Sequence, residues 1–512
     1  MRRMYPILSF SFVLFLAVLC VDFLFTGLFV GLPESESGWL VIWSVTVAIV
    51  IFLLVIFCVR SMLMTVVVFV VFVLIFFCRV VQKNKEMTYN YENLPVNGEF
   101  YGCAVSYPQL LGGEKLNDKE FYFQMKVTRM RAGSVFVPVR PFVVQVNCRN
   151  VSEEEVLCWG NYRVAGRLRV NKSVYFLSKN CIGRLNAKSI ASVDKYIHPM
   201  LLVGKLRAKL LNHLKSCLSG QSYAFIAAIF FGNRTHIDTQ MMESWRNSGL
   251  THLLAVSGFH VGVLAMIVQC CLRRFLSRTV TNVFTAIVLV IFGFFLNVSA
   301  SSLRAILMCF VLMINGEVGI NSGKLHSLAI AGIILLFINP YMIYDYGFIL
   351  SFVAVAGILL FSSKIIPNKE NVSTVFYNFL SANAVCIAAF GSTVLFQCAW
   401  FGQIPIFSVF TSTFVCFVFS CVFIVLLACI LLIIIFPDTI VLCVFIEKVC
   451  GFFLMIVKIL EKVPPIKTEN VPLYMGFVLL VGVLVYFYIA VPMYWWFKRR
   501  IKVGKLKKLI KL

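Results

Sequence analysis

The residues best suited to chemistry in this sequence stand in one short stretch, Gly249 to Leu264 (GLTHLLAVSGFHVGVL). It places His252, Ser257 and His260 in a segment that is otherwise apolar enough to enter a membrane. Polar side chains at that depth are costly unless they face protein or water. A chain therefore retains them for packing or for function.

A Ser–His nucleophile pair is the first hypothesis for this stretch. Ser257 and His260 are three residues apart in the sequence, so on a helix they would share one face. We do not favour catalysis, because no acidic residue stands nearby in the sequence to orient the imidazole. His252 and His260 would be about 12 Å apart on a regular helix, too far for one metal ion unless the chain breaks at Gly258.

Two further hypotheses involve helix packing. In one, the histidines and Ser257 make hydrogen bonds between helices while Gly258 and Gly262 permit close packing. In the other, which we favour and which includes such packing, a broken helix lines a polar path across the membrane.

Two charged residues beside later apolar runs join this set. Arg304 follows a patch of Asn and Ser residues, and a guanidinium there is costly unless it pairs, extends to the membrane surface or faces water. We expect a polar, positively charged throat, with extension to the surface as the alternative. Asp345 follows the helix-ending pair Asn339–Pro340, and either complements the dipole of the next helix or pairs with Arg304.

The composition places all these residues in a membrane protein. Of the 512 residues, 60% are hydrophobic and 13% are charged, whereas soluble domains have about 45–50% apolar and about 25% charged residues. Uninterrupted apolar runs of about 20 residues recur along the chain. We therefore expect a polytopic all-α membrane bundle of about 10–12 transmembrane helices with an inserted small all-β, OB-like external domain.

Charge and hydropathy divide the chain into four parts. Residues 1–81 hold the first transmembrane helices, and residues 82–199 are the polar external domain. Residues 200–497 hold the remaining membrane and interfacial helices, and residues 498–512 form a basic cytoplasmic tail. Binding to anionic lipid is the simplest interpretation of that tail, with nucleic acid as the alternative.

Three segments of the third part carry specific expectations. The run from Leu201 to Leu218 has basic residues at helical spacing and predicts an interfacial helix. Ser302 to Ile314 is short and begins with polar residues, so we expect half of a broken helix. Ile440 to Val463 carries five charged residues, so it either spans the membrane or lies on its surface.

The external segment alternates apolar and polar residues between Gly, Asn and Pro, as about five short strands do. Between Gln124 and Lys188 there are twelve Lys or Arg residues and three acidic residues. The aromatic residues interleaved with them include Phe136, Tyr162, Tyr175 and Phe176. A basic face with aromatic platforms suits single-stranded nucleic acid. A solvated domain with a purely structural aromatic core, or one that binds sugars or proteins, remains the alternative.

The 18 cysteines lie mostly in apolar runs, where they act as small hydrophobic residues. Cys103, Cys148, Cys158 and Cys181 fall in the external segment, where about one or two disulfides are expected, with the pairing open. No CxxC pair or His/Cys cluster indicates a metal site. We therefore expect no metal and no cofactor.

Three spaced blocks resemble the ComEC competence family of inner-membrane channels for transforming DNA. The first runs FFGNRTHIDTQMMESWRNSGLTHLLAVSGFHVGVL, the second spans Ser301 to Ala305, and the third is NPYMIYDYGFILSF, from Asn339 to Phe352. The resemblance covers approximately residues 90–500. That family also has an OB-like external domain after its first membrane spans.

The resemblance implies a channel that imports single-stranded DNA across the bacterial cytoplasmic (inner) membrane during natural transformation. It marks a set of positions along the DNA path, to which we add Asp345: Gly232, Arg234, His252, Ser257, Gly258, His260 and Arg304. None of them receives a catalytic role, so we expect a protein that is not an enzyme.

Expected partners follow from two motifs that the sequence lacks. Many family members carry a metallo-β-lactamase-like domain with an HxHxDH motif, which this sequence does not contain, and it has no P-loop for ATP. We therefore expect a separate nuclease and a cytoplasmic ATP-driven translocase, together with a DNA receptor. A homo-oligomer is compatible with this scheme.

An integral-membrane enzyme acting on a lipid-linked or polar substrate is the alternative hypothesis. Its site would consist of His252, His260, Arg304 and Asp345. Such an enzyme requires an acid, a base and a substrate pocket that converge within a few ångströms, whereas a channel requires these residues around a continuous path. A relative that no longer transports DNA is a third hypothesis.

Overall fold

The computed structural model describes residues 78–80, 82–83, 94, 97–110, 120–132, 135–137, 139, 141–149, 156–171, 173–193, 200–254, 256–296, 300–318, 324–365, 373–404, 406–436, 439–462 and 466–467. The expectations for membrane helices within residues 1–77 and for the basic tail, residues 498–512, lie outside these residues.

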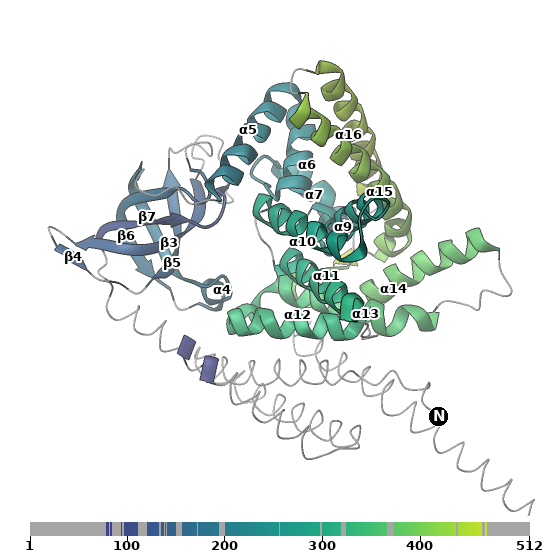
Figure 1. Ribbon diagram of the computed structural model, residues 1–512, viewed down its shortest axis with the longest axis horizontal. Coiled ribbons are helices and arrows are strands. Elements are labelled where there is room, and N and C mark those ends of the chain that lie inside the picture. Colours follow the sequence, from purple (N-terminus) through teal and green to yellow (C-terminus); the bar gives the residue numbers. More distant parts are fainter. Residues whose placement is uncertain are drawn as a thin grey trace, which may run out of the picture.

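A small β-barrel stands beside the helical part of the chain (Figure 1). Its strands are β1 (Asn97–Ala104), β3 (Glu120–Ala132), β5 (Phe142–Arg149), β6 (Asn161–Val170) and β7 (Cys181–Ser192). The pairings run β1–β6–β7–β5–β3, and β3 pairs again with β1, so these five strands close on themselves. Only the β5–β7 pair among them is parallel. Two short strands, β2 (Gln109–Leu110) and β4 (Val135–Val137), pair with β3, and the short helix α4 (Val174–Ser178) connects β6 to β7.

The apolar side chains whose alternation predicted these strands fill the interior of the barrel. Along β6, buried and more exposed side chains alternate: Val164 and Leu168 point inward, while Arg163 and Arg167 are exposed. Large apolar side chains from the other strands complete the interior, among them Phe100, Phe123, Met125 and Leu185. The prediction of a small all-β domain is confirmed as a five-stranded barrel.

The remainder of the described chain is mainly helical. Its helices are α5 (Leu201–Cys217), α6 (Gly220–Phe231), α7 (Thr239–Asn247), α8 (Thr251–Leu254), α9 (Gly258–Leu272), α10 (Arg278–Phe295), α11 (Ala300–Val318), α12 (Lys324–Ile338), the 3-10 helix η2 (Pro340–Tyr344), α13 (Tyr346–Ile365), α14 (Thr374–Phe401), α15 (Ile406–Ile435) and α16 (Ile440–Glu461). Two short strands, β8 (Gln403–Ile404) and β9 (Ile466–Lys467), pair with each other. In Figure 1, α5 leads from the barrel into the helices, and α6 and α7 lie near their centre.

Three described helices are long and apolar enough to cross a membrane: α10, the part of α15 from Thr411 to Ile435, and α16. Apolar side chains on their outer faces, such as Phe417 at 69% exposure, require a lipid surround. The protein is therefore a membrane protein, and a membrane-spanning α16 accords with its length despite its charges. Because α11 is one continuous helix, the expectation of a half-helix there is wrong.

The centre of the bundle is built around α6, a short helix that is apolar on all sides and almost wholly buried. Phe225 of α6 stacks on Trp245 of α7 and on Phe453 of α16, with ring centroids 5.7 and 5.4 Å away. Helices far apart in sequence are thus held around one aromatic core, which fixes the position of the neighbouring α8–α9 segment.

Candidate functional site

The stretch from Gly249 to Leu264 contains a helix break, as the sequence predicted. Helix α8 ends at Leu254 and α9 begins at Gly258. Ser257 caps α9: its Oγ accepts the Phe259 N–H at 3.2 Å, and the Ser257 N–H donates to His260 Nδ1 at 3.1 Å. Reciprocal contacts of this kind form a capping box, here with histidine in the place that Glu or Gln usually takes.

This geometry argues against the Ser–His nucleophile. Ser257 Oγ does lie 3.0 Å from His260 Nδ1, but the same nitrogen already accepts the Ser257 amide. The buried His260 ring stands edge-on to Phe419 and Phe423, with centroids 5.5 and 4.9 Å away, and its Nε2 has no hydrogen-bond partner. In the described part of the chain no carboxylate orients the ring, and the pair caps the first turn of α9 and holds that helix against α15.

His252 is placed differently from His260. Its Nδ1 lies 3.1 Å from the Gly249 carbonyl oxygen, and its side chain is exposed, whereas His260 is fully buried. In the part of the chain that the structure describes, the two histidines do not belong to any cluster of metal-ligating side chains.

Arg304 of α11 is buried, so the alternative in which it extends to the membrane surface is wrong. Its Nη1 donates to the Ser351 carbonyl at 3.1 Å, and its guanidinium carbon lies 5.8 Å from the centre of the Phe352 ring. Nearby, Ser351 Oγ lies 2.9 Å from Ser301 Oγ, which gives α11 and α13 a second polar contact. Arg304 thus joins these two helices.

Gly258 lies directly against Arg304. A Cβ atom at Gly258 would stand 2.9 Å from Arg304 Nη2 and 3.4 Å from the Ala305 Cβ, whereas one at Gly262 would meet nothing within 4 Å. A side chain at position 258 would therefore displace the end of the buried Arg304 guanidinium, whereas one at position 262 would displace nothing. The first helical residue after the break is in contact with the buried arginine.

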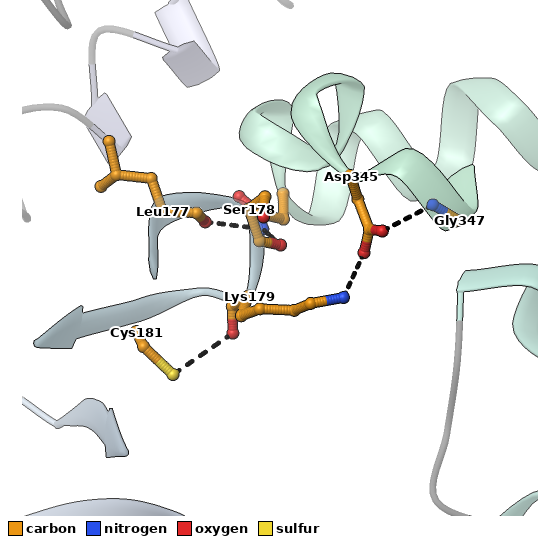
Figure 2. Close-up of polar contacts among 7 residues, drawn as sticks. Leu177, Ser178, Lys179, Cys181, Asp345 and Gly347 are labelled. Atoms are coloured by element: carbon orange, nitrogen blue, oxygen red, sulfur yellow. Dashed lines mark hydrogen bonds and ion pairs between the residues drawn. The ribbon is translucent and has the colours of Figure 1, made fainter. Parts of the chain in front are cut away.

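Asp345 pairs with Lys179 of the barrel domain, and the expected pair with Arg304 is not formed (Figure 2). The Nζ–Oδ2 distance is 2.5 Å, and Asp345 Oδ1 accepts the Gly347 N–H at 2.9 Å at the start of α13. The expectation that Asp345 opens the helix is met, but its charged partner comes from a different domain. Within the described residues, Asp345 is thus paired with Lys179 and not with Arg304, its companion in the alternative enzyme site.

The neighbouring Asn339 makes the same interdomain joint. Its Nδ2 donates to the carbonyl oxygens of Leu177 and Ser178, at 3.2 and 2.9 Å, at the end of α4. Tyr341 of η2 packs into the barrel core. Asn339, Tyr341 and Asp345 therefore connect the third family-like block to the barrel.

Gly232 and Arg234 lie where α6 ends. Gly232 caps α6 with φ = 64°, a left-handed conformation that favours glycine. Asn233 is buried and its Oδ1 accepts both the N–H and the Oγ–H of Thr235. This turn leaves Arg234 exposed and within electrostatic reach of Tyr122 on β3.

Arg207 is a positioning residue that could not be singled out from the sequence alone. It is buried on α5, where Nε donates to the Phe295 carbonyl and Nη2 to the Phe231 carbonyl, both at 3.0 Å. These carbonyls end α10 and α6 and have no partner within their own helices. The guanidinium also stacks 3.5 Å over the Tyr107 ring.

Tyr107 extends that joint into the barrel domain. Burial raises the pKa of its phenol, and the Arg207 charge opposes this only in part. The phenol stays protonated and donates to the Phe294 carbonyl at 2.9 Å. Arg207 and Tyr107 therefore connect the barrel domain to the ends of two membrane-side helices.

The outer surface of the barrel is basic, as the composition of the segment indicated. Exposed basic side chains stand on three strands: Lys126 and Arg129 on β3, Arg163, Arg167 and Arg169 on β6, and Arg184 and Lys188 on β7. Of the aromatic residues named as platforms, only Phe136 is known to be exposed, at 59%. Tyr162 and Phe176 are buried, so their assignment as platforms is wrong; the Tyr175 side chain is outside the described part.

The disulfides expected in this domain are not formed. Cys103, Cys158 and Cys181 carry unbonded thiols, and the buried Cys148 Sγ lies 3.3 Å from the Phe121 carbonyl oxygen. Burial raises the pKa of the Cys158 thiol to about 12, which keeps it protonated.

The blocks that resemble one family in sequence therefore meet in space. Gly258 of the first block contacts Arg304 of the second, and Arg304 binds Ser351 of the third. Their contacts join α9, α11 and α13 directly beside a break in the chain. Among the described residues these contacts involve a guanidinium, hydroxyl groups and backbone carbonyls, and they hold the three helices together.

Comparison with known proteins gives consistent matches. A family model described as "Competence protein" matches residues 229–499. The chain is 30% identical to ComE operon protein 3 of Bacillus subtilis over 161 residues, which are 31% of this chain and 21% of that protein. It is 31% identical to Recombination protein 2 of Haemophilus influenzae over 169 residues, again 31% and 21% of the two chains.

A third relative is an uncharacterized protein of Aquifex aeolicus, 26% identical over 200 residues, which are 36% of this chain and 48% of that protein. The matches thus span less than half of each of these relatives. No solved structure matches significantly.

Proposed function

Because this chain belongs to the competence protein family, we propose that it forms a membrane channel that imports single-stranded DNA during natural transformation. The observation that carries the proposal is the junction at Arg304. Three blocks that are separate in sequence meet there, beside a helix break. Polar residues at a broken helix are a common way to line a route through a bilayer.

The proposed path begins at the barrel. Its exposed arginines and lysines would collect the phosphates of a single strand, with Phe136 as a stacking platform. Its five-stranded closed sheet supports an OB-like assignment for residues 82–199. The exposed Arg234 and His252 would contact the strand next.

Different roles follow for the buried positions. Arg304, Gly258 and His260 are engaged with neighbouring helices, so they would hold the route closed in this conformation. Ser257 and Gly232 would set the two helix ends that border it, and Asp345 would keep the barrel in place above it. No residue in this scheme makes or breaks a covalent bond.

The orientation in the membrane follows from α10. It starts at Arg278, which pairs with Glu317 at 3.8 Å, and it ends at Phe294 and Phe295 against the barrel domain. Cytoplasmic helix ends carry the basic residues, here Arg273, Arg274 and Arg278. This supports an external barrel on a multi-pass bundle of the cytoplasmic membrane, with residues 200–497 as the channel part and residues 498–512 as a cytoplasmic tail.

The proposed partners follow from the same scheme. A DNA receptor would deliver the strand, a nuclease would remove its complement, and a cytoplasmic ATP-driven translocase would pull it inward. A deletion strain tests the proposal when uptake and recombination are assayed separately. We expect loss of nuclease-resistant labelled DNA in the cell and normal recombination of electroporated DNA. Normal uptake in the deletion strain would overturn the proposal.

A further inference from the structure

A second group of chemically capable side chains lies away from the Arg304 junction, where α5 meets α16. His213 and Cys217 are one helical turn apart on α5, and Cys443 stands in the first turn of α16. The Nε2 atom of His213 lies 3.8 Å from Cys217 Sγ. One ligand atom from each of the three residues lies within 4.8 Å of the other two.

These distances suit one small thiophilic metal ion. A zinc ion binds Cys sulfur at about 2.3 Å and His nitrogen at about 2.0–2.1 Å, which in a tetrahedral site places ligand atoms about 3.5–3.8 Å apart. The His213–Cys217 separation already has this value, and the remaining atoms need to move by about 1 Å or less. We propose that His213, Cys217 and Cys443 bind a zinc ion, which joins α5 to α16.

The charge balance favours this occupant. Two thiolates and a neutral imidazole bring a divalent cation to zero net charge, which suits a site between membrane-associated helices. Cys443 is buried and His213 is half-buried, while Cys217 is exposed. The exposed side leaves room for water as the fourth ligand and gives the ion a route of entry.

An independent polar contact holds the same two parts of the chain in register. Glu447, one turn after Cys443, accepts hydrogen bonds from the Ser219 N–H at 3.1 Å and the Ser219 Oγ at 2.5 Å. It also accepts one from the Ser222 Oγ at 2.9 Å. Because Ser219 lies in the turn after α5 and caps α6, this contact positions the α5–α6 turn over the start of α16. The three ligands are thus held near one another before any ion binds. The zinc proposal does not depend on the proposed role in DNA uptake.

The test uses the full chain in lipid nanodiscs, purified without chelators and analysed for metal content by mass spectrometry. We expect about one zinc ion per chain. The variants Cys217→Ser and Cys443→Ser should carry zinc at the level of a protein-free blank. Cys421→Ser, at an exposed cysteine of α15, should keep the wild-type content.

A second measurement guards against misfolding of the buried Cys443 variant. Cys217 is exposed, so its replacement by Ser should leave the protein folded. Co²⁺ added to chelator-stripped wild type should give the strong sulfur-to-cobalt absorption of a thiolate site, and the folded Cys217→Ser variant should show much less of it.

Two results would overturn the proposal. One is a zinc content of the wild-type protein that does not exceed that of the folded Cys217→Ser variant, which includes the case in which all variants carry equal zinc. The other is a Cys217–Cys443 disulfide in freshly isolated protein, detected by mass spectrometry without reductant, because a bonded pair of sulfurs cannot serve as two thiolate ligands.

Discussion

At the scale of single residues, the unusual side chains have roles in the structure that differ from those expected from the sequence. Ser257 and His260 touch each other, but the contact is a helix cap and not a nucleophile with its base. Arg304 is neither at the membrane surface nor paired with an acid; it is buried against Gly258 and the Ser351 carbonyl. Within the described residues its Nε has no hydrogen-bond partner, and burying a guanidinium that is only partly satisfied is costly.

Gly258 offers a direct test of that junction. In Gly258→Ala the new methyl group would displace the Arg304 guanidinium. We therefore expect the free energy of unfolding to decrease by about 1–3 kcal/mol, the usual effect of overpacking. Transformation frequency should fall as well. Gly262→Ala is the matched control, because a Cβ there meets nothing within 4 Å; it should be neutral or stabilising by about 1 kcal/mol. Thermal midpoints in detergent would show the difference, and identical behaviour of the two variants would contradict the packing account.

Substitutions of Ser257 distinguish a helix-capping role from a role as nucleophile. Asparagine caps helices about as well as serine but cannot act as a serine nucleophile, so Ser257→Asn should retain transformation. Ser257→Ala should lose about 1 kcal/mol of stability. Loss of transformation in Ser257→Asn at wild-type protein levels would indicate that the hydroxyl itself is required.

At the scale of secondary-structure elements, the barrel domain is attached to the helices by two joints. One consists of Lys179–Asp345 and the Asn339 amide bonds to α4. The other consists of Tyr107 of the barrel domain, which donates to the Phe294 carbonyl and stacks under Arg207 of α5. The ion pair is partly exposed, with 40% of the Lys179 side chain accessible, and such pairs contribute only about 0–1 kcal/mol. Arg207 in turn holds α5 to the carboxyl ends of α6 and α10 through two charge-assisted hydrogen bonds, which makes the second joint the stronger one.

Replacing Arg207 should therefore affect the whole joint. Arg207→Ala leaves two helix-terminal carbonyls unpaired and removes the stacking on Tyr107, for an expected loss of about 2–5 kcal/mol. Arg207→Lys should recover only part of this, since an ammonium lacks the planar fork. Lys209→Ala, on an exposed position of the same helix, should change stability by less than about 0.5 kcal/mol. Equal thermal midpoints for the Arg207 and Lys209 variants would contradict the assignment.

Much of the element structure could be predicted from local pattern. Alternation along residues 161–170 predicted β6, and the apolar run after Arg278 predicted α10, because burial on one face imposes a period on the sequence. The break at Gly258 was also predictable.

Contacts between distant segments could not be predicted in this way. Asp345 is paired by Lys179 of another domain, and Arg207 had the spacing of any basic surface residue on an amphipathic helix. Which face of a strand turns inward depends on register, and for this reason Tyr162 was misassigned. His213 and Cys443 show the same limit, since α5 and α16 meet only in the folded chain.

At the scale of the whole molecule, a basic barrel stands on one side of an apolar bundle, and α5 runs between them (Figure 1). The separation of charge and apolar surface suits a protein that concentrates a polyanion at the membrane before moving it. The net charge of +24 strengthens attraction to phosphate at low salt, and the attraction weakens as salt is added.

Salt dependence tests this role of the barrel. For single-stranded DNA, log K decreases linearly with log salt concentration, and this dependence becomes shallower by about 0.7 for each phosphate contact that is removed. We expect Arg163→Ala and Arg167→Ala, on exposed positions of β6, each to show such a change in the full chain in nanodiscs. Lys458→Ala, an exposed basic position on α16, is the control and should keep the wild-type slope. Unchanged slopes in the β6 variants would show that this face does not bind the strand.

Cross-linking during uptake tests whether a DNA strand passes the helix break. A photoreactive amino acid would replace either His252, which is exposed beside the break, or Phe417, an apolar residue of α15 with 69% exposure. Cells taking up labelled DNA would be illuminated and the protein isolated. We predict labelled single-stranded DNA attached at position 252 and none at position 417. Equal labelling at both positions, or none at 252 while uptake proceeds normally, would contradict a path along this segment.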